Sequence, residues 1–246
     1  MNQIIYYTLS ALATLLILTV HEYAHAYAAY KLGDGTAKAF GRLTLNPLKH
    51  LDPLGAICMV LFHFGWAKPV PINPRNFKKP KRDFAISALA GPLSNMLFAF
   101  ISAFFYLLIL SIFSNVKFNS EFSYLLAQNT VLFVYIFHII NIGIGIFNLV
   151  PSPPLDGSRI LNLVLPPKYY FGIMRYERKI YFGLILWLAL GDTVKRTLLS
   201  IPIIAANPIL SLLAGIFSLS DILGIIFSFV SDAMINFWQL IPFLNF

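Results

Sequence analysis

The sequence predicts an all-α bundle that crosses a membrane several times. Hydrophobic residues make up 58% and charged residues 11% of its 246 residues, and the mean hydropathy is +0.75. Soluble proteins are roughly half apolar and a quarter charged. Three apolar stretches also exceed the roughly 20 residues that a helix needs to cross a hydrocarbon core. We therefore expect a multi-pass membrane protein, with the lipid bilayer as a partner.

The three apolar stretches cover residues 4–32, 84–113 and 122–150. The first opens with "MNQIIYY", which has no basic segment, and shows no small-residue cleavage site. It is therefore predicted to be a retained helix and not a signal peptide. We expect residues 1–160 to form a transmembrane core and residues 161–246 to add C-terminal membrane or interfacial helices.

The formal charge of +8 comes from basic residues in short loops that border the apolar stretches, which favours membrane topology over nucleic-acid binding. Two basic segments, residues 31–49 and 68–82, should both lie in the cytoplasm by the positive-inside rule. The run between them, "GAICMVLFHFGW", is only about a dozen residues long, too short for a comfortable span. We predict that it is a short re-entrant element. A short or tilted true span is the alternative.

The first apolar stretch carries the segment "HEYAH", in which His21 and His25 are four residues apart with Glu22 between them. This spacing puts both imidazoles on one face of a helix, and Glu22 can reach a water held at the same metal ion. The alternative is a purely structural role, in which both histidines are buried and hydrogen-bonded to neighbouring helices. Ionisable residues inside membrane helices are costly and usually functional, so we favour a metal site.

A catalytic zinc site needs a third protein ligand and an open position for water. The one cysteine, Cys58, excludes a thiolate cluster, so the third ligand should be a histidine or a carboxylate. The candidates are Asp34, His50, Asp52, His63, His138 and Asp156. Asp156 follows three prolines that should end the third apolar helix, and such broken backbone can line a cavity at membrane depth. Asp34 lies in "KLGDGTAK", which is typical of a structural turn.

Five segments together resemble the site-2 protease family of intramembrane zinc metalloproteases: "HEYAH", "GRLTLNPLKHLDPLG", "GWAKPVPINPRNF", "ALAGPLSN" and "FNLVPSPPLDG". They follow the family order from about residue 4 to residue 160. No segment resembles the PDZ or CBS domains of larger members, so the chain resembles a minimal form. The resemblance implies that residues 1–160 are the catalytic core.

The resemblance also implies the roles of individual residues. His21, His25 and Asp156 would bind one Zn²⁺ per chain, and Glu22 would be the general base. Asn148 would help to polarise the scissile carbonyl, and Asn95 matches the asparagine of the family's G-P-x-x-N segment. The re-entrant element would then lie near the active site.

The expected function is hydrolysis of peptide bonds in or near transmembrane segments of substrate proteins, as in regulated intramembrane proteolysis. We expect the plasma membrane of a prokaryote, with the active site toward the cytoplasm. Transmembrane proteins are the expected partners, nucleic acid is not, and homo-oligomerisation is left open. The alternative is a membrane protein that binds or transports metal through the same His and Asp residues. Transport would need ligands on both sides of the midplane, whereas these candidates cluster toward one face.

Overall fold

The computed structural model describes residues 3–53, 55, 67–215 and 218–244. Within these residues the fold is helical, and its one extended pairing is an isolated antiparallel bridge between Leu51 and Ala67. Four of the described helices are long and apolar enough to cross a membrane: α1 (Gln3–Lys31), α5 (Pro80–Ser114), α6 (Glu121–Leu149) and α12 (Leu219–Gln239). The prediction of an all-α, multi-pass membrane bundle is therefore confirmed.

The three predicted helices match α1, α5 and α6 closely. The largest difference is at α5, which begins four residues before the predicted start at residue 84. Pro80 occupies the first helical position, where a missing N–H costs nothing, and Asp83 lies in the first turn. The carboxylate of Asp83 accepts the backbone N–H of Lys79 at 3.0 Å. This polar turn extends the helix beyond its apolar part.

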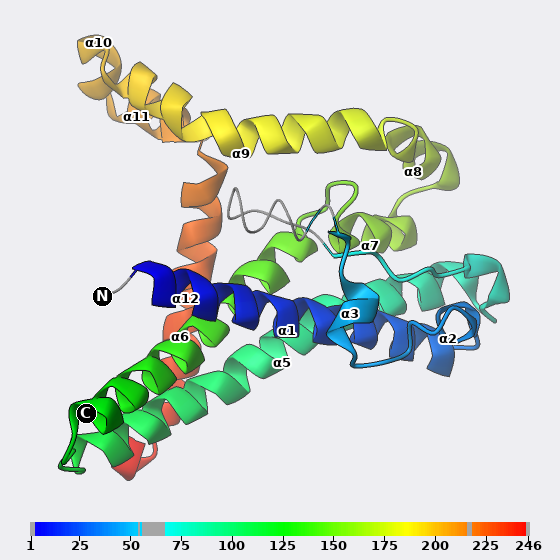
Figure 1. Ribbon diagram of the computed structural model, residues 1–246. Helices are drawn as coiled ribbons and strands as arrows, with labels where there is room; N and C mark the ends of the chain where they lie inside the picture. Colours follow the sequence, from blue (N-terminus) through cyan, green and yellow to red (C-terminus); the bar gives the residue numbers. More distant parts are fainter. Residues whose placement is uncertain (1–2, 54, 56–66, 216–217, 245–246) are drawn as a thin grey trace.

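Helices α1, α5 and α6 pack against one another and form the core of the bundle (Figure 1). Ala13 and Ile17 of α1 are buried against Ile136 of α6. Helix α12 joins this core at α5 and α6. The indole N–H of Trp238 donates to the carbonyl of Phe100 at 2.9 Å. His138 links three helices, because its ring nitrogens contact the carbonyl of Ala99 and the hydroxyl of Ser231.

The remaining elements are shorter or less apolar. They are α2 (Thr36–Ala39), α3 (Pro47–His50), η1 (Pro74–Asn76), α7 (Asp156–Val164), α8 (Pro167–Met174), α9 (Glu177–Leu199), α10 (Pro202–Ala205), α11 (Pro208–Gly215) and η2 (Pro242–Leu244). Helix α9 runs apart from the three-helix core and packs with α10, α11 and α12 (Figure 1). Helix α7 packs mainly against α5, where the guanidinium of Arg159 lies over the ring of Phe84.

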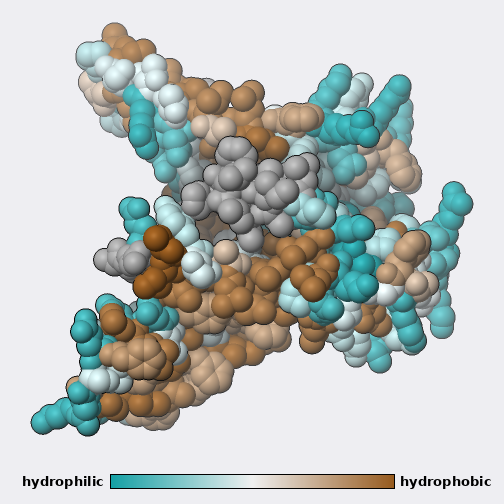
Figure 2. Space-filling view, viewed as in Figure 1, coloured by the Kyte–Doolittle hydropathy of each residue, from teal (hydrophilic) through white to brown (hydrophobic). Residues whose placement is uncertain are grey.

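The two basic segments lie together at one end of the bundle. The side-chain amide of Asn76 donates to the hydroxyl of Thr36 at 3.2 Å, although the residues are 40 positions apart. On the face shown in Figure 2, apolar residues cover the middle of α1, and hydrophilic residues gather where α1 leads into α2. Apart from its first residue, Gly55, the run predicted to be re-entrant lies outside the described residues. Its flanks, Leu51 and Ala67, pair with each other, so the chain departs from and returns to the same place.

Candidate metal centre

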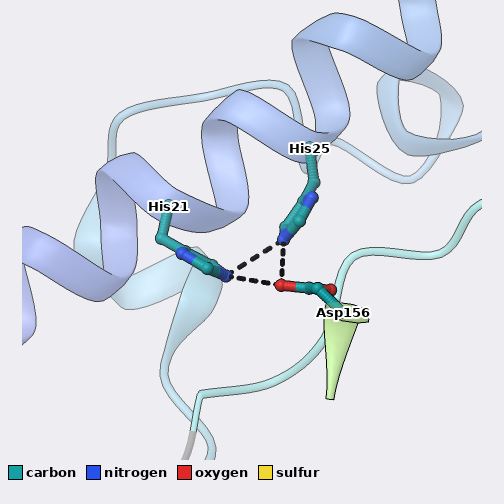
Figure 3. Close-up of side chains that lie close together, drawn as sticks. All are labelled: His21, His25 and Asp156. Atoms are coloured by element: carbon teal, nitrogen blue, oxygen red, sulfur yellow. Dashed lines mark hydrogen bonds and ion pairs between the residues drawn. The ribbon is translucent and has the colours of Figure 1, made fainter. Parts of the chain in front are cut away.

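Two histidines of α1 project together into the core. His21 and His25 are 4% and 5% exposed, and their Nε2 atoms are 3.0 Å apart (Figure 3). The spacing of four residues brings them to adjacent turns of one helix face, as the sequence predicted. Two buried imidazoles this close offer two nitrogen ligands to one ion.

Asp156, the first residue of α7, reaches the same point from a different part of the chain. Helix α6 ends at Leu149, the chain passes through a cis peptide bond between Pro153 and Pro154, and α7 begins at Asp156. The Oδ2 atom of Asp156 lies 3.2 Å from Nε2 of His21 and 3.1 Å from Nε2 of His25 (Figure 3).

The geometry of these three atoms fits one tetrahedral zinc ion. Ligands about 2.0–2.1 Å from a tetrahedral zinc lie about 3.3 Å from one another. The three observed separations are 3.0, 3.1 and 3.2 Å. Three protein ligands leave a fourth position open for water, as catalytic zinc sites do. His21, His25 and Asp156 are also the one group of potential metal ligands found among the described residues.

The ring of His25 has a partner that orients it. Its Nδ1 lies 2.7 Å from the carbonyl oxygen of Ser87 in α5, so Nδ1–H donates and the lone pair of Nε2 is left for a metal. The Nδ1 of His21 is buried and has no hydrogen-bond partner among the described residues. A backbone carbonyl of α5 therefore selects the tautomer of His25.

Two glycines allow neighbouring helices to approach closely around the candidate ligands. A Cβ atom on Gly91 of α5 would lie 2.3 Å from Nε2 of His25 and 2.6 Å from Cε1 of His21. A Cβ atom on Gly157 would lie 2.3 Å from the carbonyl oxygen of Leu149. Both distances are too short for any other residue without a shift. Sequence reasoning missed the role of Gly91, although its segment "ALAGPLSN" was part of the family resemblance.

Glu22 is adjacent to the histidines on α1 and is half-buried. Its Oε2 atom accepts the backbone N–H of Val70 at 2.9 Å, a contact between residues 48 positions apart. Sequence reasoning did not anticipate this contact, because the donor is a backbone group.

The other predicted ligand candidates in the described residues have separate roles. Asp34 accepts hydrogen bonds from Thr36, Asn73 and Asn76, which confirms the predicted structural turn. A ring nitrogen of His50 lies 2.8 Å from the carbonyl of Thr44. The carboxylate of Asp52 accepts the N–H of Gly55, and His138 links helices as described above. His63 lies outside the described residues.

The two predicted catalytic asparagines lie on the helices that frame the centre. Asn148 is half-buried near the end of α6, and its amide donates to the carbonyl of Ile144 at 3.0 Å. Asn95 lies four residues beyond Gly91 on α5 and is 1% exposed. Neither polar atom of its side chain has a hydrogen-bond partner among the described residues. A buried unpaired amide costs about 1–3 kcal/mol, so this one calls for an explanation.

Comparison with known proteins agrees with this geometry. A family model described as Peptidase family M50 matches residues 9–186, well over half of the chain. The chain belongs to peptidase family M50. This is the site-2 protease family that the sequence motifs resembled, and the match ends beyond the region in which those motifs were found.

Two relatives agree with the assignment to family M50. A candidate zinc metalloprotease named YwhC, from Bacillus subtilis, is 42% identical over 224 residues, which cover 88% of this chain and 98% of YwhC. The zinc metalloprotease MJ0392 of Methanocaldococcus jannaschii is 27% identical over 169 residues, 69% of this chain and 38% of MJ0392. No solved structure matches. The M50 chain is thus an intramembrane zinc metalloprotease, and the metal-transport alternative gains no support.

Proposed function

We propose that this M50 protease is of the site-2 type and cleaves transmembrane or membrane-proximal segments of other membrane proteins. We further propose that it lies in the plasma membrane of a prokaryote with its centre toward the cytoplasm. The observation that carries the proposal is the meeting of His21, His25 and Asp156 within 3.2 Å, with Glu22 on the same helix.

In this proposal His21, His25 and Asp156 hold the zinc ion. When bound, zinc supplies a Lewis acid and brings the pKa of a coordinated water toward about 7. Glu22 accepts the proton of the attacking water and later delivers it to the leaving amine. One of its oxygens, Oε2, accepts the Val70 N–H, and the proton would go to the other oxygen, Oε1.

Asn148 and Asn95 complete the proposed machinery. The amide nitrogen of Asn148 carries two N–H groups, and Ile144 accepts one of them, so the second can donate to the scissile carbonyl. The buried amide of Asn95 has no hydrogen-bond partner among the described residues, and it lies one helical turn from Gly91, which packs on both histidines. A buried amide without a partner in the described part of the chain supports a role in binding or catalysis.

Replacing Glu22 with Gln tests the proposal, because it removes the base but no metal ligand. We expect cleavage of a synthetic transmembrane substrate to fall by at least about 100-fold while zinc stays bound. The measurements are cleavage by the purified protein and zinc content by elemental analysis. Glu121→Gln, at an exposed position in the first turn of α6, is the matched control. Cleavage retained in Glu22→Gln would show that another group is the base.

A further inference from the structure

The carboxylate of Glu22 is held by a backbone segment that comes from far along the chain. The Val70 N–H donates to Oε2 of Glu22 at 2.9 Å, and Val70 itself is 7% exposed. Its side chain is buried in one cluster with Ala26 of α1 and Ala37 of α2. Val70 is therefore fixed against the helix that carries Glu22 by both its backbone and its side chain.

The residues on either side of Val70 make this segment stiff. Pro69 and Pro71 flank it, and each proline fixes its own φ and restricts the preceding residue to extended conformations. Prolines also lack the backbone N–H, so Val70 carries the one backbone donor of the tripeptide from 69 to 71. The sequence "PVP" thus presents a single N–H from a rigid support.

Both ends of the stiff segment are anchored. At the first end, the N–H of Lys68 donates to the carbonyl of His50 at 2.9 Å, and the guanidinium of Arg42 donates to the carbonyl of Lys68. At the other end, Asp34 accepts the backbone N–H of Asn73 at 2.7 Å and the side-chain amide of Asn76 at 2.8 Å.

Asp34 is the point that ties this segment back to α1. It is fully buried, lies three residues after the last residue of α1, and also accepts both the N–H and the hydroxyl of Thr36. The contacts therefore form a closed circuit that runs from Glu22 along α1 to Asp34, across to Asn73, and back through Val70 to Glu22.

We infer that Asp34 is a positioning residue for the general base: through Asn73 it sets the Val70 N–H, which fixes one oxygen of Glu22. The inference rests on the proposed role of Glu22. The inferred role differs from that of a turn residue, which would only stabilise the fold. A positioning role requires loss of Asp34 to slow the chemical step without weakening metal or substrate binding.

The test compares Val70→Pro, which removes the N–H, with Val70→Ala, which keeps it and loses only part of the side chain. Each full-length protein is assayed in liposomes with a synthetic transmembrane substrate carrying a fluorophore and a quencher. We expect kcat of Val70→Pro to be about 10- to 100-fold below that of Val70→Ala, because small misplacements of a catalytic group have effects of this size. KM should stay within about twofold and zinc content should not change.

Asp34→Ala, assayed in the same way, should show the same loss of kcat at unchanged KM and zinc content. Asp34→Asn keeps one acceptor oxygen, so its kcat should lie between that of Asp34→Ala and that of the unaltered protein. Equal kcat in Val70→Pro and Val70→Ala would overturn the inference. A raised KM at unchanged kcat would also overturn the inference, because it would assign the segment to substrate binding. Loss of zinc would overturn the inference by assigning the segment to the metal centre. Glu22→Gln in the same assay separates these outcomes, because only retained cleavage in that variant contradicts the proposed function.

Discussion

At the scale of single residues, two buried aspartates have contrasting surroundings. Asp34 accepts four hydrogen bonds from neutral donors, and these outweigh the effect of burial and lower its pKa. Asp156 faces two imidazoles whose Nε2 atoms must keep their lone pairs if they are to bind a metal. A buried carboxylate needs compensating donors or a cation. Asp34 has its donors, whereas Asp156 is placed to meet a cation.

This contrast predicts that Asp156→Ala and Asp34→Ala differ in zinc content. Asp156→Ala removes a ligand and should leave the purified protein with well below one zinc per chain. Asp34→Ala should keep its zinc, because its side chain contacts no ligand. Elemental analysis after gel filtration measures both. Equal zinc loss in the two variants would show that Asp156 is not the third ligand.

At the scale of helices, the metal centre depends on how closely α5 approaches α1. Gly91 faces both imidazoles, so a methyl group there must displace His21 and His25. Helix α5 makes a second contact with these ligands one turn earlier, where the carbonyl of Ser87 orients His25. The same helix therefore both leaves space for the ligands and fixes the ring of one of them.

Gly91→Ala should consequently weaken zinc binding by at least about 10-fold, the size of effect seen when groups around the ligands of a metal are altered. Gly143→Ala is the matched control, because a Cβ atom at Gly143 of α6 meets nothing within 4 Å. Competition with a zinc chelator of known affinity measures both variants. Unchanged affinity in Gly91→Ala would mean that α5 can shift without disturbing the ligands.

The helices and the candidate site also show how much of the structure could be predicted from the sequence. Helices α1, α5 and α6 were predictable from apolar length, whereas α12 was expected only among unspecified C-terminal membrane or interfacial helices. The pair His21 and His25 was predictable from the period of an α-helix. The proposed third ligand, Asp156, was not predictable from spacing, because it follows a proline-rich break whose path is set by tertiary packing. The broken backbone made Asp156 a candidate, and the family resemblance then selected it. The Val70 contact was missed because a backbone N–H leaves no side-chain pattern, although the flanking prolines signal a rigid segment.

At the scale of the whole molecule, the contact between Asn76 and Thr36 places both basic segments at one end of the bundle. Lys117 lies in the turn between α5 and α6, at the opposite ends of those helices. In the proposed orientation, which follows the positive-inside rule, the basic end faces the cytoplasm and the Lys117 turn lies on the other side. A polypeptide with the reverse orientation would place two strongly basic segments outside, against the charge bias that sets topology.

Single cysteines at Lys49, Lys78 and Lys117, each exposed and each introduced in a Cys58→Ser background, test this arrangement. In intact cells an impermeant thiol reagent should label only the Lys117 variant. In inverted membranes the reagent should label the Lys49 and Lys78 variants but not the Lys117 variant. Labelling of Lys49 and Lys78 from opposite sides would mean that the chain between them crosses the bilayer. Because the Asp34 contacts require both segments on one side, that result would also contradict the circuit that holds Glu22.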